Sequence, residues 1–313
     1  MPTLQQLRYL TAIADTLHFR RAAEAVNVTQ PTLSAQLKEL ERRLGVQLVE
    51  RSRARVVLTP IGRDIAARAR RVLRDVEEIR DLARQTRPLA STIRTGVVHS
   101  LGSYLLPLII PDLHESHPDL RLYVREALPD ALLDQIEDGR VDLLFYPLPV
   151  DRQDLVTVPL FSEPLRVVLP REHRLASRPV IDPGDLRGET ILTLEPGHRL
   201  YDQVRSLAGT FEADLSHDYE GTSLDTLRQM VAMGLGISLL PALYIRSEVL
   251  RERLLVARPV RGPEPARLIG MVWRRGSARH AEFEKLAGLI AAILSRTAPE
   301  IDIRHVGTKL SAT

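Results

Sequence analysis

Near the N-terminus, apolar residues recur at helical spacing in two consecutive segments of residues 19–44. The first segment carries a stripe of small side chains, which lets another helix cross it closely. The second carries leucines spaced four, three and four residues apart, at Leu33, Leu37, Leu40 and Leu44. Between them, Thr29 is a suitable N-cap residue and Pro31 fits the first helical turn. The pattern predicts two helices joined by a tight turn.

The second of these helices also has a polar, mostly uncharged face. That face consists of Gln30, Thr32, Ser34, Gln36 and Lys38, with Pro31 in the first turn. Amides and hydroxyls can hydrogen-bond base edges when such a helix lies in the major groove of DNA. The segment is therefore a candidate DNA-reading helix. A helical hairpin that only packs into a core is the alternative.

After Gly45 the sequence alternates weakly between apolar and polar residues, which predicts a two-stranded wing with a basic tip. The basic residues are Arg51, Arg53 and Arg55. Arginines on such a tip suit contacts to phosphates or to the minor groove. A solvated charged turn is the alternative use of the same residues.

From Thr59-Pro60 to about Arg87, the sequence predicts one long charged helix with a narrow apolar seam. The seam positions are Ile61, Ile65, Ala69, Val72, Val76, Ile79 and Ala83. A long helix with one narrow apolar stripe usually pairs with another helix. Packing against its own domain is the alternative, and Pro88 ends the predicted helix.

From Thr92 onward, short β-rich segments alternate with helical ones. Strands at about 93–99, 120–127 and 141–148 enclose helices at 102–115 and 130–139, and a second set of strands and helices spans about 160–241. A strand at 267–275 and an amphipathic helix at 278–295 follow. Such alternation predicts an α/β fold with a mostly parallel sheet in two lobes.

Charge and composition narrow the class of protein. Residues 1–90 hold 17 Lys and Arg against 10 Asp and Glu, a formal charge of +7, whereas the remainder is at −4. A basic N-terminal third on a mildly acidic body fits a DNA-binding head with a separate control module. The 313 residues include no cysteine, which excludes disulfides and thiol redox chemistry. We find no signal peptide and no apolar run of the about 20 residues that a membrane span needs, so we expect a cytoplasmic protein without a membrane partner.

The N-terminal segment resembles the winged helix-turn-helix of the LysR-type transcriptional regulators. The matching residues are Phe19, Ala22, Ala23, Gln30-Pro31-Thr32-Leu33-Ser34, Leu40-Glu41, Leu44-Gly45, Leu48 and Glu50-Arg51. The resemblance implies an α/β protein with a winged helix-turn-helix at 1–59, a dimerising linker helix at 60–90 and a two-lobed, periplasmic-binding-protein-like effector domain at 91–297. We expect lobe one at about 91–162 and 267–297, lobe two at about 163–266, and a loose tail at 298–313.

The resemblance also implies the partners. They are a double-stranded DNA operator, a small-molecule effector and a second copy of the chain, in a homodimer or a homotetramer. RNA polymerase is a candidate further partner, and no cofactor is expected. The target genes and the choice between activation and repression remain open.

In two-lobed α/β folds, ligands gather where strands end and helices begin, because unpaired N–H groups and the helix dipole favour anions there. Three such corners stand out, at 98–100, at 197–202 and at 221–223. We predict that they supply Ser100, His198, Arg199, Asp202 and Thr222 to one effector site, with Arg267 as a further candidate. Each corner by itself is equally explained as a capped helix start.

Within the family, the chain is most similar to the peroxide-sensing OxyR branch. Shared segments include HFRRAA, YLLPLIIPDLHESHPDL and TSLDTLRQMVAMGLGISLLPAL. Arg199 and Ala208 stand where that branch carries its two redox cysteines, so thiol switching cannot operate here. Ser100, His198 and Asp202 match the branch, but Pro129 replaces a residue that often faces the cleft.

Arg199, His198 and Arg267 could bind a carboxylate or phosphate through charge-assisted hydrogen bonds. Alternatively, Arg199 pairs internally with Asp202 or Glu195 and fixes one conformation. The effector itself is not identified by these residues.

Other classes of protein fit less well. A hydrolytic triad of Ser100, His198 and Asp202 lacks the G-x-S-x-G motif, and a histidine and an aspartate four residues apart on one helix orient each other poorly. A solute-binding transport protein would need export. The histidines show no metal-binding spacing. We therefore predict a ligand-controlled DNA-binding regulator and not an enzyme.

Overall fold

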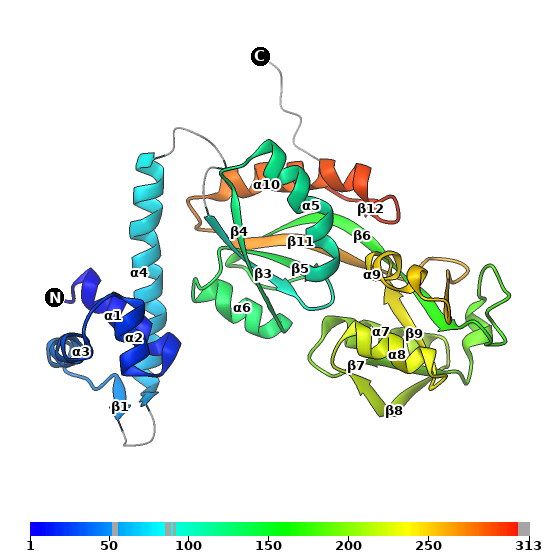
Figure 1. The fold of residues 1–313 in the computed structure, drawn as a ribbon, viewed down its shortest axis with the longest axis horizontal. Coiled ribbons are helices and arrows are strands. Elements are labelled where there is room, and N and C mark those ends of the chain that lie inside the picture. The colour runs from blue at the N-terminus through cyan, green and yellow to red at the C-terminus, as the bar shows by residue number, and fades with distance from the viewer. Residues whose placement is uncertain (52–55, 85–88, 90–91, 306–313) are drawn as a thin grey trace, which may run out of the picture. The chain divides into compact units, whose positions relative to one another are not determined.

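The computed structural model describes residues 1–51, 56–84, 89 and 92–305 (Figure 1). The chain divides into two compact units, one of residues 1–86 with 137–140 and the other of residues 87–136 with 141–313. Among the described helices, none is long and apolar enough to cross a membrane.

The first unit is a winged helix-turn-helix. It contains α1 (Leu4–Thr16), α2 (Phe19–Ala25) and α3 (Gln30–Leu44), followed by the antiparallel strands β1 (Val49–Arg51) and β2 (Val56–Leu58) and then α4 (Pro60–Arg84). Thr3 caps α1 in a capping box with Gln6, Thr29 caps α3, and Gly45 ends α3 in the left-handed conformation with φ 71°. These are the start and stop signals that the sequence carries locally.

The core of this unit forms from the predicted apolar stripes. Ala22 and Ala23 of α2 are buried against Leu33, Leu37 and Leu40 of α3. The wing is tied to the same helix, because the Glu41 carboxylate accepts the backbone N–H groups of Leu48 at 2.9 Å and Val49 at 3.1 Å. The position of the wing is thus set by a side chain of the helix that is predicted to read DNA.

The junction between the wing and α4 is equally constrained. The Thr59 hydroxyl accepts the Gly62 N–H at 2.9 Å and donates to the Gln47 carbonyl at 2.8 Å. A Cβ atom on Gly62 would lie 2.0 Å from the Leu48 carbonyl oxygen, so only glycine allows α4 to start this close to the wing.

Helix α4 has two different apolar faces. Ala66 is buried in the core of its own unit, Ile65 packs against that core, and the Arg70 guanidinium donates to Asp15 of α1 at 2.6 Å. Ile61, Val72 and Ile79 remain exposed, at 43%, 42% and 64%, whereas Ala69 is buried. Three of the predicted seam residues therefore face solvent, and Ile65 belongs to the internal contact.

The second unit is built on one sheet path that runs through both lobes. The strand order is β4-β3-β5-β11-β6-β9-β7-β8, and β10 and β12 also pair with β6. Lobe one contains β3 (Thr92–Val98), β4 (Arg121–Ala127), β5 (Leu143–Leu148) and β11 (Ala266–Arg274), with α5 (Gly102–Ser116), α6 (Pro129–Glu137) and α10 (His280–Thr297). Helices α5 and α10 lie side by side (Figure 1).

Lobe two contains β7 (Thr190–Leu194), β8 (Asp214–Gly221), β9 (Ile237–Pro241) and β10 (Leu255–Arg258), with α7 (Arg199–Thr210) and α8 (Leu224–Ala232). The short elements are α9 (Ala242–Ser247) and the 3-10 turns η1 (Pro183–Leu186) and η2 (Val249–Arg251). In each lobe three strands are parallel, as predicted, because helices connect them.

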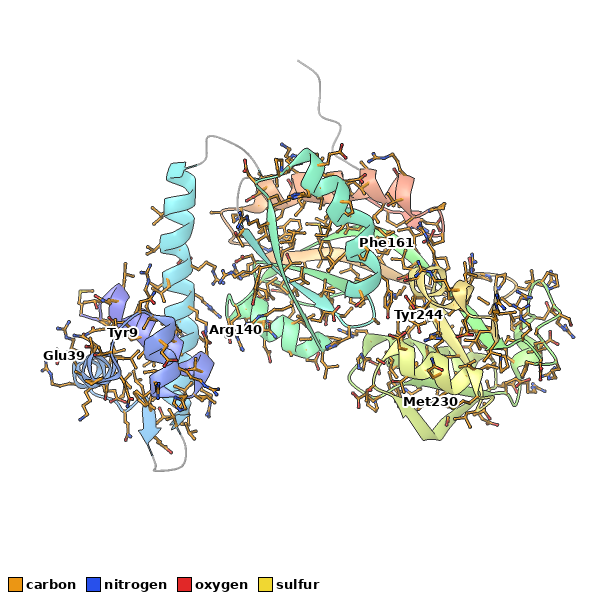
Figure 2. The ribbon with its side chains drawn as sticks, in the orientation of Figure 1. Tyr9, Glu39, Arg140, Phe161, Met230 and Tyr244 are labelled. Atoms are coloured by element: carbon orange, nitrogen blue, oxygen red, sulfur yellow. The ribbon has the colours of Figure 1, made fainter. Side chains whose placement is uncertain are left out.

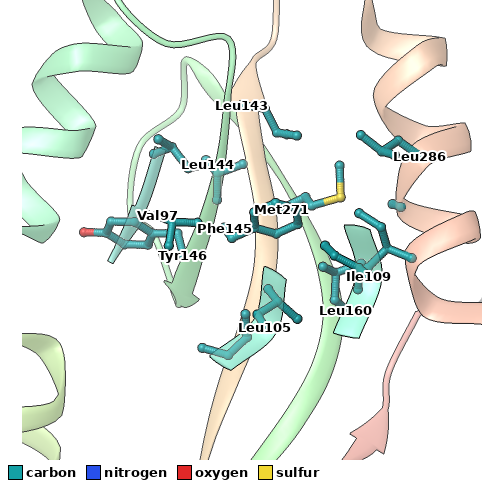
Figure 3. Close-up of a cluster of buried hydrophobic side chains, with 14 of the residues drawn as sticks. Val97, Leu105, Ile109, Leu143, Leu144, Phe145, Tyr146, Leu160, Met271 and Leu286 are labelled. Carbon is teal, nitrogen blue, oxygen red and sulfur yellow. The ribbon is translucent and has the colours of Figure 1, made fainter. Parts of the chain in front are cut away.

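The strand β6 (Leu155–Pro170) joins the lobes. It pairs with β11 from Leu155 to Pro164 and with β9 from Leu165 to Val168, both antiparallel. Each lobe has its own apolar core (Figure 2). In Figure 3, Val97, Phe145 and Met271 lie within the core of lobe one. Tyr104 of α5 packs edge-on against Tyr244 of α9, with ring centroids 5.0 Å apart, and contacts both cores.

Residues 298–305, which we expected to belong to a loose tail, are ordered on lobe one. Ala298 and Ile301 are buried, and β12 (Asp302–Ile303) pairs with β6. The Arg304 N–H also donates to the Leu160 carbonyl at 2.8 Å. The apolar residues of this short segment cover the core beside α10, and so few residues give no periodic signal in the sequence.

Candidate functional sites

The candidate DNA-reading helix, α3, presents the predicted polar residues on its surface. Gln30, Pro31, Thr32, Gln36 and Lys38 are exposed, and Ser34 is half-buried. Two of these side chains are held within the unit. The Thr32 hydroxyl lies 2.8 Å from that of the capping residue Thr29, and Gln36 accepts a hydrogen bond from Gln6 of α1 at 3.2 Å.

A further exposed residue of α3 was missed from the sequence. Ala35 is exposed, and together with Pro31 it lies opposite the buried leucines, between the two groups of polar residues. A methyl group on this ridge can pack against a thymine methyl in the major groove. Among the predicted wing residues, Arg53 and Arg55 lie outside the described residues, as does the side chain of Arg51.

At the junction of the two lobes, an ion pair is completely buried. The Arg267 Nε of β11 donates to the Glu163 carboxylate of β6 at 2.8 Å, and the side chains are 4% and 0% exposed. The Arg267 guanidinium also donates to the Ser100 hydroxyl at 2.8 Å and to the Ser100 carbonyl at 2.9 Å. The second oxygen of Glu163 accepts the Leu243 N–H at the start of α9 at 2.9 Å.

This network assigns Arg267 and Ser100 to each other in the present conformation. Both residues were predicted from the sequence as candidates for effector binding, and the structure brings them together. However, the Arg267 guanidinium uses three of its five N–H donors in these hydrogen bonds, and its side chain is only 4% exposed, so burial keeps a ligand away from it in this arrangement. The network holds the end of β3, both crossing strands and α9 in one arrangement.

His198 is the buried residue that precedes α7. Its ring faces His99 from lobe one, with centroids 6.2 Å apart, and its Nε2 lies 3.9 Å from the Glu195 carboxylate. Burial and the proximity of His99 lower the pKa of His198, and Glu195 opposes this shift only in part. The imidazole is therefore neutral at pH 7, and it offers one donor and one acceptor instead of a charge.

Arg199 is the first residue of α7 and its side chain is exposed. Neither Asp202 nor Glu195, the two internal partners considered from the sequence, lies within ion-pair distance of it among the described side chains. Its guanidinium instead lies near the hydroxyl of Tyr146, which is on β5 in the opposite lobe. Burial raises the pKa of Tyr146, and Arg199 partly offsets that rise. Arg199 and Tyr146 are thus a second contact between the lobes.

The remaining predicted residues make no described contact with this group. Asp202 and Thr222 are exposed, and no hydrogen bond joins either of them to Ser100 or His198 within the described part of the chain. Ser223, the residue after Thr222, caps α8 by accepting the Thr226 N–H at 3.2 Å. Among the described side chains, no group of three or more metal-ligating residues could hold a metal ion.

Sequence reasoning missed Glu163 and Tyr146. Each is a polar residue in a mostly apolar segment, Glu163 in LFSEPLRVVLP and Tyr146 in LLFYPL. Because charged residues are almost never buried without a partner, a lone glutamate in such a strand predicts a buried counter-charge. That signal was available in the sequence, although its partner Arg267 was not identifiable from spacing.

Two family models match the chain. Residues 4–63 match the bacterial regulatory helix-turn-helix protein, lysR family, and residues 86–295 match the LysR substrate binding domain. The chain is therefore a DNA-binding transcriptional regulator of the LysR family and not an enzyme. This confirms the predicted fold class, a helix-turn-helix followed by a periplasmic-binding-protein-like α/β domain.

Within this family the chain is OxyR-like. It is 41% identical over 290 residues to the DNA-binding transcriptional dual regulator OxyR of Escherichia coli K12, covering 92% of this chain and 95% of that protein. A probable hydrogen peroxide-inducible genes activator of Streptomyces viridosporus is 38% identical, with 92% and 93% covered. A full-length OxyR variant of Pseudomonas aeruginosa, with a cysteine replaced by aspartate, superimposes with a TM-score of 0.79 at 36% identity and 95% coverage of both chains.

The contacts of α3 generate a prediction about sequence preference. Replacing Gln30 or Ser34 by Ala should relax the preference for the operator, because each good base contact contributes about 1–3 kcal/mol of discrimination. Arg53→Ala should instead weaken all DNA about equally and flatten the salt dependence of binding. Titration of operator and scrambled DNA at several salt concentrations measures both effects. A changed preference in Arg53→Ala with none in Ser34→Ala would reverse these assignments.

The buried ion pair generates a prediction about stability. Arg267→Ala should lower the free energy of unfolding by about 3–5 kcal/mol, because it leaves the Glu163 carboxylate buried without its counter-charge. Denaturant unfolding of the full-length protein measures the change. Arg166→Ala is a matched control on β6, since it breaks the half-exposed pair of Arg166 with Glu264 and should cost less than about 1 kcal/mol. Equal losses in the two variants would contradict the role given to the buried pair.

Proposed function

We propose that this regulator binds its operator under the reversible control of a small anionic effector, held at the junction of the lobes, without thiol oxidation. The observation that carries the proposal is Arg199, an exposed guanidinium at the start of α7 in a chain that has no cysteine. The OxyR-like relatives are named for their response to hydrogen peroxide. This chain has no cysteine, so a peroxide response that works by thiol oxidation cannot operate in it.

The surroundings of Arg199 favour an anion. In the first turn of α7 the Tyr201 N–H donates to the carbonyl of the N-cap residue His198 at 3.0 Å. N–H groups at a helix start otherwise lack partners within the helix, and the helix dipole places partial positive charge there. The neutral His198 adds hydrogen-bonding capacity beside it. A carboxylate or phosphate at this position would be stabilised by charge-assisted hydrogen bonds from the guanidinium.

Control requires only that the effector binds one arrangement of the lobes more tightly than another. A tenfold change in operator affinity corresponds to about 1.4 kcal/mol of coupling. One or two charge-assisted hydrogen bonds that form in only one arrangement supply that much. Contacts from opposite lobes, such as those of Arg199 and Tyr146, support such a difference.

Assembly through α4 is the second part of the proposal. Ile61, Val72 and Ile79 form an exposed apolar stripe on a helix whose other face packs on its own unit. Pairing two such stripes would remove them from water and would hold two DNA-reading heads at a fixed spacing. A homodimer through α4 is therefore expected, and a homotetramer would use further surfaces.

The first prediction concerns peroxide and Arg199. Mild hydrogen peroxide should leave the operator footprint unchanged, with or without reductant, because only the four methionines oxidise readily. A small-molecule screen for footprint changes should yield an anionic effector whose action weakens at least tenfold in Arg199→Ala. Arg205→Ala is the matched control, since Arg205 is exposed on the same helix and stacks on Tyr201. A peroxide-specific footprint change that survives Arg199→Ala would refute the proposal.

The second prediction concerns the dimer. Val72→Glu should break the dimer. The new carboxylate would be buried in the apolar seam of the dimer, which is costly, whereas in the monomer it would face water. Operator affinity should fall along with the sedimentation coefficient. Arg71→Gln changes the net charge by the same amount on a neighbouring side of α4 and should remain dimeric. If Val72→Glu sediments like the parent protein and still binds the operator, α4 is not the dimer seam.

A further inference from the structure

The Tyr146 side chain is buried in lobe one, yet its hydroxyl has no hydrogen-bond partner. The residue is 0% exposed, and none of the described groups completes a hydrogen bond of normal geometry with its oxygen. In Figure 3 the ring lies at the margin of the core cluster, and the oxygen points away from the other labelled side chains. Most buried polar atoms in folded proteins are paired, so an orphan hydroxyl calls for an explanation.

Packing alone does not explain the hydroxyl. The rest of the strand, Leu143, Leu144 and Phe145, is apolar and buried. Phenylalanine would fill the same space and would avoid the desolvation of an unpaired oxygen. A tyrosine here therefore stabilises the protein less than phenylalanine would, unless its hydroxyl and the neighbouring Arg199 guanidinium together bind something that is not part of the chain.

The charges around the hydroxyl come from both lobes. Arg199 at the start of α7 approaches from lobe two, and the exposed Asp130 at the start of α6 lies on lobe one. Burial raises the pKa of Tyr146, Arg199 opposes the rise in part, and Asp130 adds to it. The hydroxyl therefore keeps its proton and is available as a donor at neutral pH.

We infer that the Tyr146 hydroxyl and the Arg199 guanidinium, one from each lobe, together hold a single carboxylate group of the effector. This inference rests on the proposed function and specifies its ligand. A planar carboxylate can accept two parallel N–H groups from a guanidinium and still has lone pairs for one O–H donor. Such an acceptor would satisfy the orphan hydroxyl.

The charge balance selects a monoanion. Arg199 is the one permanent positive charge that approaches the hydroxyl among the described groups, because Arg267 is neutralised by Glu163. The lowered pKa of His198 adds no second charge, and the Asp130 carboxylate repels added negative charge. A phosphate dianion would be undercompensated in this setting, whereas one carboxylate is matched.

With its two anchors on different lobes, a bound carboxylate can shift the equilibrium between arrangements of the lobes. Its two donors belong to β5 and α7, which move with different lobes. An anion that bonds both favours the arrangement in which they are close, and it does so by its differential affinity alone. Separating the lobes would leave the carboxylate with only one of its two anchors.

The test is a titration of the full-length protein with acetate, at constant ionic strength set by chloride, followed by calorimetry. Tyr146→Phe should weaken acetate binding roughly tenfold, the loss of one hydrogen bond to a charged group, and Arg199→Ala should weaken it further. Tyr123→Phe, which removes the hydroxyl of a tyrosine that is 55% exposed on β4, should bind acetate like the parent. Inorganic phosphate should bind more weakly than acetate.

Thermal unfolding without added anion separates a ligand-binding role from a structural one. The Tyr146 hydroxyl of the parent protein is unpaired, so removing it costs no hydrogen bond. The Tyr146→Phe variant should therefore unfold at the same or a higher temperature than the parent. A lower unfolding temperature combined with unchanged acetate affinity would overturn the inference. Acetate binding that depends on Arg199 and not on Tyr146 would also overturn it, while leaving the proposed function intact. Stronger binding of phosphate than of acetate would exclude the carboxylate.

Discussion

The buried pair of Glu163 and Arg267 is the interaction on which the regulatory unit depends. These residues face each other on β6 and β11, close to the point where β6 exchanges one sheet partner for another. Two charges without solvent are costly, and only complete hydrogen bonding offsets that cost. The oxygens of Ser100 and the Leu243 N–H supply the missing partners. The hydrogen bonds of this pair therefore fix the positions of four segments relative to one another: the end of β3, the strands β6 and β11, and the start of α9.

Two arginines at the same junction consequently have different roles. Arg267 is buried and paired with Glu163, so it holds β6 and β11 together where the lobes join. Arg199 is exposed at a helix start and lies beside a hydroxyl with no partner. Structural rigidity and ligand capacity are thus assigned to separate side chains. Under the proposed function, this separation would let an anion bind at Arg199 without disturbing the buried Glu163–Arg267 pair.

The DNA-binding unit has helix caps and wing contacts that join residues close in the sequence. Its helices begin at side-chain caps, its core consists of the stripes visible in the sequence, and Glu41 and Thr59 fasten the wing through nearby backbone groups. Helix α4 combines this unit with a separate exposed stripe. The unit therefore has its own core, and in the proposed dimer the spacing of two such units on DNA would be set by the pairing of α4.

The sequence by itself determined the winged helix-turn-helix, the alternation of strands and helices after Thr92, the cap of α3, the family and the absence of thiol chemistry, because these depend on neighbouring residues or on composition. It predicted a single effector site, which stays a prediction; its residues are Ser100, His198, Arg199, Asp202, Thr222 and Arg267. Only the tertiary structure paired Arg267 with Glu163 across 104 residues of chain and Arg199 with Tyr146. The same holds for β12, whose few residues take their order from contacts with β6. Such contacts arise from how strands cross between lobes, and no periodicity along the chain records that crossing.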